Sequence, residues 1–298
     1  MIRRLLEEAA ELVRRSYEPS QVLLIEAPTG YGKSTSVPVL AEGLYENEYA
    51  FNFIHVLPLR AIVSDLYRKM YLRSFDGGAG KPLLRVREAL ERMGIGKDDV
   101  AYQMGMDALL KEVGGRKSPS FDARAVVSTL DSFAYNLLRV PVSDSFRATK
   151  RYAIVRARIF TSAVFFDEAH MILRYPDDED AGRELAFMKA LTEYARAARV
   201  PLIVSSATIG SWFEGKVREW SQEHVRIVKL GPGDEGGPER TAIQVRDPDY
   251  EEEAKAIEWV TRLVSEGEVV LKARCLAECG LRVLVDRDRV SDAVSTYE

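Results

Sequence analysis

The chain has 298 residues, of which 46% are hydrophobic and 30% charged, and its formal net charge is −4. These values are typical of a globular protein with one large or two modest domains, and they argue against a surface that is basic overall, though not against a local positive groove. The two cysteines imply no disulfide framework or zinc cluster, and without a long apolar run or a signal-peptide core we expect a cytoplasmic protein with no membrane partner.

Apolar runs and helical patterns alternate up to residue 230. Apolar residues recur at helical spacing over residues 2–16, which predicts an amphipathic helix. Continuous apolar runs, typical of strands buried on both faces, follow at 21–28, 51–58, 125–130, 163–167, 201–206 and 225–230. Helical stretches come between or after them at 33–45, 61–71, 131–138, 182–198 and 212–221. This alternation predicts an α/β fold, a parallel sheet flanked by helices.

Glycine and proline mark the divisions of the chain. Residues 76–82 and 111–120 have the composition of surface insertions, and the run from Gly231 to Pro238 is the strongest break. We therefore place one domain at residues 1–237 and a linker with a partial second domain at residues 238–298. The second unit is predicted to contain a strand, an acidic helix, a strand and the start of a helix, at 241–245, 250–267, 281–286 and 290–297.

The most informative motif follows the first strand and reads Ala27-Pro28-Thr29-Gly30-Tyr31-Gly32-Lys33-Ser34, with Thr35 next. A strand, a glycine-containing loop and a helix in this order cradle nucleotide phosphates, because loop N–H groups and the helix N-terminus point at the anion. In such a loop Lys33 reaches the terminal phosphates and the Ser34 hydroxyl ligates Mg²⁺. Ala27 stands where the strict pattern has its first glycine, so the loop alone is also compatible with a coincidental match.

Two further strands end in residues that suit the same chemistry. Asp167 and Glu168 follow a buried strand, at the edge where ligands of open α/β sheets bind. In a P-loop enzyme the first acid holds Mg²⁺, directly or through water, and Glu168 orients and deprotonates the attacking water. Without the loop, the pair would be an ordinary strand end with solvated charges. The strand at 201–206 leads into Ser206-Ala207-Thr208, whose hydroxyls in isolation are most simply helix caps.

Together these segments resemble motifs I, II and III of the superfamily 2 helicases, in the family's order. Motif I corresponds to residues 29–34, motif II to Asp167-Glu168-Ala169-His170, and motif III to Ser206-Ala207-Thr208. Weaker matches are also in order. Pro58-Leu59-Arg60 resembles motif Ia, Ser128-Thr129-Leu130-Asp131 resembles the motif that closes around the tracking strand, and residues 281–293 resemble motif IV.

Within the superfamily the chain is most similar to the DEAH-type, stand-alone CRISPR-associated helicase of archaeal type I interference systems. That similarity lies in residues 27–34, 58–61, 129–133 and 166–170. It implies a RecA-like P-loop domain followed by the truncated start of a second RecA-like domain. It also implies ATP and Mg²⁺ as cofactors, single-stranded DNA as partner with RNA as the alternative, and a separate HD nuclease and a CRISPR surveillance complex as further partners.

The resemblance also assigns roles to residues. The nucleotide is expected along residues 27–35, with Mg²⁺ at Ser34 and Asp167. The catalytic set is expected to be Lys33, Asp167, Glu168 and His170. Nucleic acid is expected at Pro58, Arg60, Thr129 and Asp131, and Ser206, Ala207 and Thr208 are expected to couple hydrolysis to domain closure. Two plainer roles remain open: His170 as a buried polar contact and Arg60 as a solvated charge at a helix start.

The sequence departs from the family in two respects. No HD-type nuclease precedes the loop, and the three histidines, His55, His170 and His224, are scattered along the chain, so no His-Asp site for DNA cleavage is predicted. The chain also ends before motifs V and VI, which supply the family's arginine finger, and we expect a fragment with impaired hydrolysis. Besides an ATP-dependent DNA helicase, a non-unwinding translocase of the restriction or remodelling type and an ATP- and DNA-binding fragment without efficient turnover stay open.

Overall fold

The computed structural model describes residues 2–76, 80–105, 115–138, 152–171, 179–233, 241–256 and 266–280. Its contacts divide the chain into two compact units, Met1–Pro248 and Asp249–Glu298. Helix α10 (Pro248–Ala256) begins at the last residue of the larger unit, and α11 (Glu266–Glu278) lies in the smaller one. In the described part of the chain, no helix is both long and apolar enough to cross a membrane.

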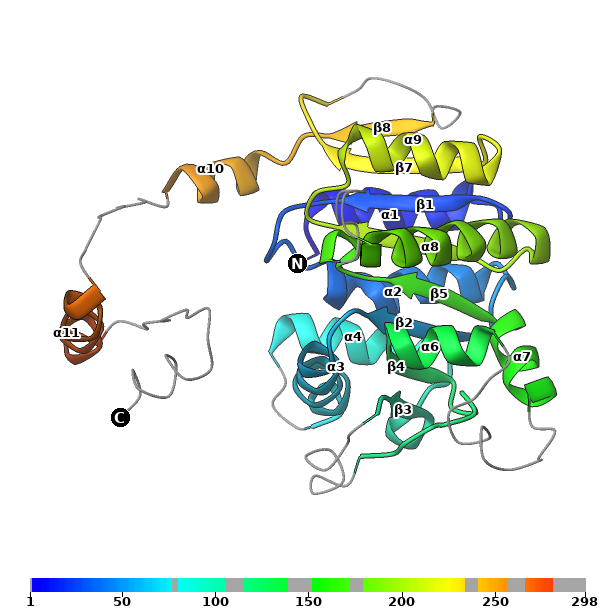
Figure 1. Ribbon diagram of the computed structural model, residues 1–298, viewed down its shortest axis with the longest axis horizontal. Coiled ribbons are helices and arrows are strands. Elements are labelled where there is room, and N and C mark those ends of the chain that lie inside the picture. Colours follow the sequence, from blue (N-terminus) through cyan, green and yellow to red (C-terminus); the bar gives the residue numbers. More distant parts are fainter. Residues whose placement is uncertain are drawn as a thin grey trace. The chain divides into compact units, whose positions relative to one another are not determined.

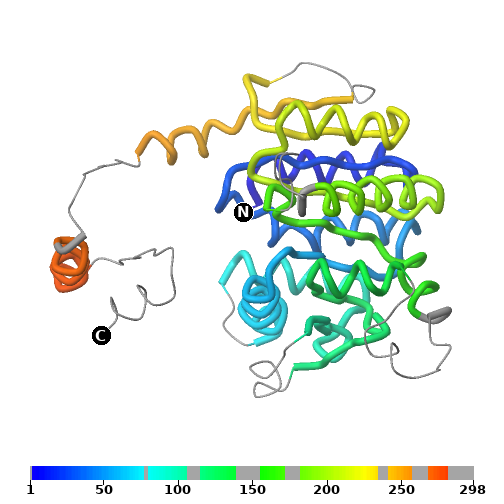
Figure 2. Tube along the Cα trace, in the orientation of Figure 1, coloured from blue at the N-terminus to red at the C-terminus, as the bar shows by residue number. Residues whose placement is uncertain are grey.

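The larger unit contains one eight-stranded sheet in which every neighbouring pair is parallel, with the order β3-β4-β2-β5-β6-β1-β7-β8. The strands are β1 (Val22–Glu26), β2 (Asn52–Leu57), β3 (Val100–Gln103), β4 (Ala125–Thr129), β5 (Ser162–Phe166), β6 (Leu202–Ser206), β7 (Val225–Leu230) and β8 (Ala242–Val245). Figure 2 shows the chain path, with β1 beside the much later β7. The predicted parallel sheet is thus confirmed.

Helices cover both faces of this sheet (Figure 1). They are α1 (Arg4–Arg15), α2 (Lys33–Glu46), α3 (Arg60–Leu66) with the π-helix Tyr67–Leu72 directly after it, α4 (Lys81–Arg92), α6 (Leu130–Leu137), α7 (Tyr152–Phe160), α8 (Glu179–Ala198) and α9 (Gly210–Ser221). On one side α2 packs against both α1 and α4, and on the other α8 packs against α9. This two-layered covering explains why the central strands are continuous apolar runs, since both of their faces are buried.

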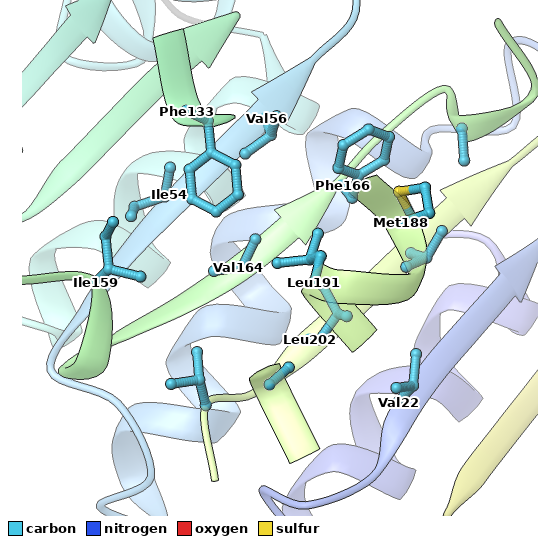
Figure 3. Packing of buried hydrophobic residues seen from close by; sticks show 14 of the residues in the cluster. Val22, Ile54, Val56, Phe133, Ile159, Val164, Phe166, Met188, Leu191 and Leu202 are labelled. Atoms are coloured by element: carbon cyan, nitrogen blue, oxygen red, sulfur yellow. The ribbon is translucent and has the colours of Figure 1, made fainter. Parts of the chain in front are cut away.

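The core on the α8 side joins strands and helices that are far apart in sequence (Figure 3). Val164 and Phe166 of β5 lie between β2 and β6, and Met188 and Leu191 of α8 pack over them. Phe133 of α6 closes the same cluster and is fully buried. Burial of these side chains stabilises the sheet by about 25 cal/mol per Å² of apolar surface, and so holds the strand ends in register.

The register brings three strand ends to one edge. β1 lies between β6 and β7, and Glu26 is level with Ser206. β5 lies on the other side of β6, with Phe166 level with Val204. Because parallel strands all end at the same edge, the loop after β1, the acids after β5 and the end of β6 meet there.

Three features differ from the predictions. The strand expected at 241–245 to open a second unit is β8, which pairs with β7 and so extends the first sheet. β3, α4 and α7 were not predicted, because β3 has only four residues and α4 is rich in charges. The expected acidic helix over 250–267 corresponds to α10 up to Ala256 and to the first residues of α11, while the strand at 281–286 and the helix at 290–297 lie outside the described residues.

Candidate functional site

The loop after β1 is shaped by two glycines in the left-handed region, Gly30 with φ +79° and Gly32 with φ +100°. A side chain at either position would be strained, which explains both glycines. Gly32 is the N-cap of α2, so the helix begins at Lys33. Ala27 has no positive φ, and its N–H extends the sheet by donating to the carbonyl of Ser206 at 3.1 Å. Alanine is therefore accommodated where the strict pattern has glycine.

Lys33 lies beneath the loop rather than in solvent, and only 4% of its surface is exposed. Its Nζ donates to the carbonyl oxygens of Ala27 at 2.8 Å and Pro28 at 3.1 Å. The Thr35 hydroxyl donates to the carbonyl of Gly32 at 2.9 Å and braces the same turn. The Lys33 ammonium thus points toward the inner side of the loop, where phosphate oxygens would replace the two carbonyl oxygens as its hydrogen-bond acceptors.

Asp167 stands at the carboxyl end of β5 and is fully buried. Its Oδ2 lies 2.6 Å from Ser34 Oγ and 3.4 Å from His55 Nε2, and its Oδ1 lies 2.5 Å from Ser205 Oγ and 3.0 Å from the backbone N of Glu168. Burial alone would raise the pKa of Asp167, but the bonds from His55, Ser205 and Ser34 outweigh burial and lower it from 3.8 to about 2. The side chain is therefore a carboxylate held by four donors.

His55 is a site residue that the sequence interpretation missed, and it is fully buried on β2. A carboxylate can only accept, so His55 Nε2 carries the hydrogen that it donates to Asp167. Nδ1 then accepts from the Tyr71 hydroxyl, 2.9 Å away. The signal was available in the sequence, since a histidine inside the apolar run Asn52–Leu57 needs polar partners. Although far apart in sequence, His55 and His170 each contact one of the two acids that follow β5, Asp167 and Glu168.

Glu168 and His170 connect the end of β5 to the end of β6. Glu168 has φ +55°, and its Oε2 lies 3.3 Å from His170 Nδ1. The backbone N of His170 donates to Ser206 Oγ at 3.2 Å, and His170 Nδ1 lies 3.2 Å from the same oxygen. Ser206 Oγ in turn donates to the carbonyl of Thr208 at 3.0 Å. His170 thus contacts both Glu168, one of the two strand-end acids, and Ser206, the first residue of the segment Ser206-Ala207-Thr208.

The four residues expected at nucleic acid lie on two neighbouring strand ends of the same edge. β2 and β4 pair so that Leu57 is level with Thr129, and Pro58 and Arg60 follow β2 as Asp131 follows β4. Arg60 and Asp131 are exposed, and the Arg60 guanidinium lies beside Gly105. An exposed guanidinium at this edge suits contact with a phosphate backbone.

Thr129 is buried and has a structural role in addition to the expected one. Its hydroxyl oxygen accepts from the Ser132 backbone N–H at 3.4 Å, which caps α6, and its hydroxyl lies 3.1 Å from Ser132 Oγ. Thr129→Ala should therefore lower the free energy of unfolding by about 1 kcal/mol, because the cap is lost. Urea denaturation measures this, and Thr129→Ser, which keeps the hydroxyl, should unfold like the parental chain. An alanine variant as stable as the parent would show that the hydroxyl does not cap the helix.

The donor set suits Mg²⁺ shared with a bound phosphate. In the described residues, no group of three or more histidine, cysteine, aspartate and glutamate side chains could hold a metal ion. Ser34 and Asp167 offer oxygen ligands, which Mg²⁺ prefers, and it commonly takes few protein ligands and completes its shell with phosphates and water. Ser34 donates its hydrogen to Asp167, so the lone pairs of its oxygen remain available to a cation.

Known proteins that resemble this chain include two Cas3 proteins and Dbp5, while no protein-family model matches the chain. Over 213 residues, 69% of this chain, the sequence is 25% identical to the CRISPR-associated helicase Cas3 of Thermoproteus tenax, of which 32% is covered. The structure of T. fusca Cas3 with AMPPNP matches with a TM-score of 0.51 and 16% identity, over 75% of this chain and 23% of that one. An S. cerevisiae Dbp5 variant in a complex with ADP matches with a TM-score of 0.50 and 13% identity, over 99% and 68%.

These likenesses differ in what they establish. The two solved structures show the fold, which is that of RecA-like helicase domains. The sequence likeness to the T. tenax protein spans about a third of that protein's length. In fold, motif order and sequence the chain is thus similar to superfamily 2 helicases, among them the CRISPR-associated helicase Cas3.

Proposed function

We propose that this chain is the ATP-binding part of a nucleic-acid helicase or translocase, which couples ATP hydrolysis to movement along single-stranded DNA in CRISPR interference. The observation that carries the proposal is the 2.6 Å contact between Ser34 Oγ and Asp167 Oδ2. It joins the phosphate loop to the strand-end acids across 133 positions of sequence, at the edge where open α/β sheets bind ligands. The named activity of the T. tenax helicase and the AMPPNP and ADP bound in the solved structures support it.

Each residue of the site has a separate proposed role in phosphoryl transfer. Bound Mg²⁺ and ATP would supply a γ-phosphoryl group whose charge is partly neutralised. N–H groups of the loop and of the start of α2 would bind phosphate oxygens, and Lys33, which donates to the Ala27 and Pro28 carbonyls, would donate to the phosphate oxygens instead. Ser34 and Asp167 would hold the cation. Glu168, the next residue, orients the attacking water and accepts its proton.

His170 and the segment Ser206-Ala207-Thr208 are proposed to relate hydrolysis to domain closure, because His170 contacts both Glu168 and Ser206. Pro58, Arg60, Thr129 and Asp131 are proposed to contact the nucleic-acid backbone. Such contacts carry little base information and suit a motor that must accept any sequence. A separate HD nuclease, a CRISPR surveillance complex and a second RecA-like domain that begins after Pro248 complete the proposal.

The test measures ATP binding by calorimetry and ATP hydrolysis by phosphate release, with and without single-stranded DNA or RNA. Lys33→Ala should weaken ATP binding about 30-fold, since charge-assisted hydrogen bonds to phosphate are lost. Lys69→Ala is the matched control, because Lys69 is exposed and pairs with Asp65.

Each outcome separates the alternatives. A parental chain that binds no ATP contradicts the proposal. Binding with no DNA-stimulated hydrolysis identifies a fragment without turnover. In a two-domain version, hydrolysis and translocation without strand displacement identify the non-unwinding translocase. Hydrolysis that RNA stimulates and DNA does not would identify RNA as the bound strand.

A further inference from the structure

Tyr31 is the one large side chain of the phosphate loop, and it does not face the phosphate site. It stands between the two left-handed glycines, Gly30 and Gly32, yet only 1% of its surface is exposed. Its hydroxyl donates to Asp247 Oδ2 and accepts from the backbone N–H of Leu5 at 3.3 Å. The Arg3 guanidinium lies 5.2 Å from the centre of its ring. The middle of the loop is therefore tied to the start of α1 and to the segment after β8.

Asp247 is the unusual partner in this arrangement. It lies just after β8 and immediately before Pro248, the first residue of α10, yet it is 5% exposed and 216 positions from Tyr31. A buried carboxylate is costly unless donors satisfy it. Burial raises the pKa of the Tyr31 hydroxyl above its ordinary value, and the bond to Asp247 raises it further, so the hydroxyl keeps the hydrogen that it donates.

A purely structural role would be ordinary for a buried tyrosine, and Tyr17 provides the comparison. The Tyr17 hydroxyl donates to the carbonyl of Gln21 at 2.7 Å and accepts from the backbone N–H of Leu202 at 3.2 Å, so it joins parts of the core. Tyr31 instead lies between two glycines of the phosphate loop. Lys33 and Thr35 hold the loop through bonds to its own carbonyls, whereas the Tyr31 hydroxyl anchors it to segments outside the loop.

We propose that Tyr31 and Asp247 are positioning residues, whose hydrogen bond holds the phosphate loop in the shape that receives phosphates and ties nucleotide binding to the segment that follows β8. This inference rests on the proposed function of the loop. It follows from preorganisation: a loop already held in one shape loses less conformational freedom when a ligand binds. By reciprocity, a ligand that orders the loop must also order the segment around Asp247.

The experiment compares ATP affinity, measured by calorimetry, in the full chain and four variants. Tyr31→Phe keeps the ring and should weaken ATP binding about tenfold, the scale of one hydrogen bond to a charged group. Asp247→Ala should cause a similar loss, and the Tyr31→Phe/Asp247→Ala double variant should lose no more than either single one. Asp247→Asn keeps an acceptor oxygen and should recover most of the affinity. Tyr17→Phe, the matched control, should bind ATP like the parental chain.

A second readout separates positioning from simple destabilisation. Hydrogen exchange of residues 242–247, which comprise β8 and the segment up to Asp247, should slow when ATP binds the parental chain and Tyr17→Phe, and should not respond to ATP in Tyr31→Phe. Thermal unfolding identifies any variant that fails to fold. Parental affinity in Tyr31→Phe, additive losses in the double variant or an unchanged exchange response would overturn the inference and leave the proposed function intact. Absence of ATP binding by the parental chain would overturn both.

Discussion

A Glu168→Gln chain should bind ATP as tightly as the parental chain and hydrolyse it about 10³-fold more slowly, the scale of a lost general base. Glutamine keeps the size and backbone of Glu168 but cannot accept a proton from water. Lys33 and Ser34, which are proposed to bind the nucleotide and its Mg²⁺, keep their positions, because their contacts do not involve the Glu168 side chain. Calorimetry with ATP and single-turnover phosphate release, both in the presence of single-stranded DNA, separate the two effects.

Glu48→Gln is the matched control for this variant. Glu48 is also a glutamate with positive φ, at +60°, but it is exposed at the end of α2, away from the strand-end acids. Its substitution should change neither binding nor hydrolysis. If Glu168→Gln hydrolyses ATP at the parental rate, the base lies elsewhere, and the role of the strand-end pair has to be reassigned.

His55→Leu should lower the free energy of unfolding by about 3 kcal/mol, the scale of breaking a buried polar pair. Leucine removes the donor to the Asp167 carboxylate and the acceptor of the Tyr71 hydroxyl, both of which stay buried. The Tyr71→Phe/His55→Leu double variant should be more stable than His55→Leu, because it lacks the buried Tyr71 hydroxyl that His55→Leu leaves without its hydrogen-bond partner. Urea denaturation with linear extrapolation measures the parental chain, both single variants and the double variant.

His224→Leu controls for the change of residue type. His224 is exposed near the start of β7, so its replacement should alter the free energy of unfolding by no more than about 0.5 kcal/mol. Equal stability of His55→Leu and the parental chain would mean that the contacts of His55 contribute nothing net to folding. Purely additive effects in the double variant would show that His55 and Tyr71 act independently.

The sheet was predictable because its strands are buried on both faces. β1, β2, β4, β5, β6 and β7 contain apolar runs whose ends agree with the structure to within two residues. β8 was recognised as a strand but assigned to the wrong unit, since the Gly231–Pro238 break suggested a domain boundary. Local sequence signals that a strand exists, but its partner depends on contacts across the whole chain.

The phosphate loop, the acids and the serine after β6 were predictable because each follows a strand and carries side chains suited to one chemistry. His55 and Tyr71 were not, because their roles come from a contact between β2 and β5 and from the π-helix Tyr67–Leu72. The partnership of Tyr31 with Asp247 was also invisible, since those residues become neighbours only after the sheet adds β7 and β8 beyond β1.

At Glu168 the left-handed backbone conformation favours one residue for stability, and the proposed catalysis needs another. A φ of +55° costs a glutamate about 1 kcal/mol relative to glycine, which adopts it freely. Directed evolution toward thermal tolerance would therefore favour glycine at this position and discard the proposed base. With glutamate at this position, the chain adopts a locally unfavourable conformation beside the proposed site, as is common where strain and function coincide.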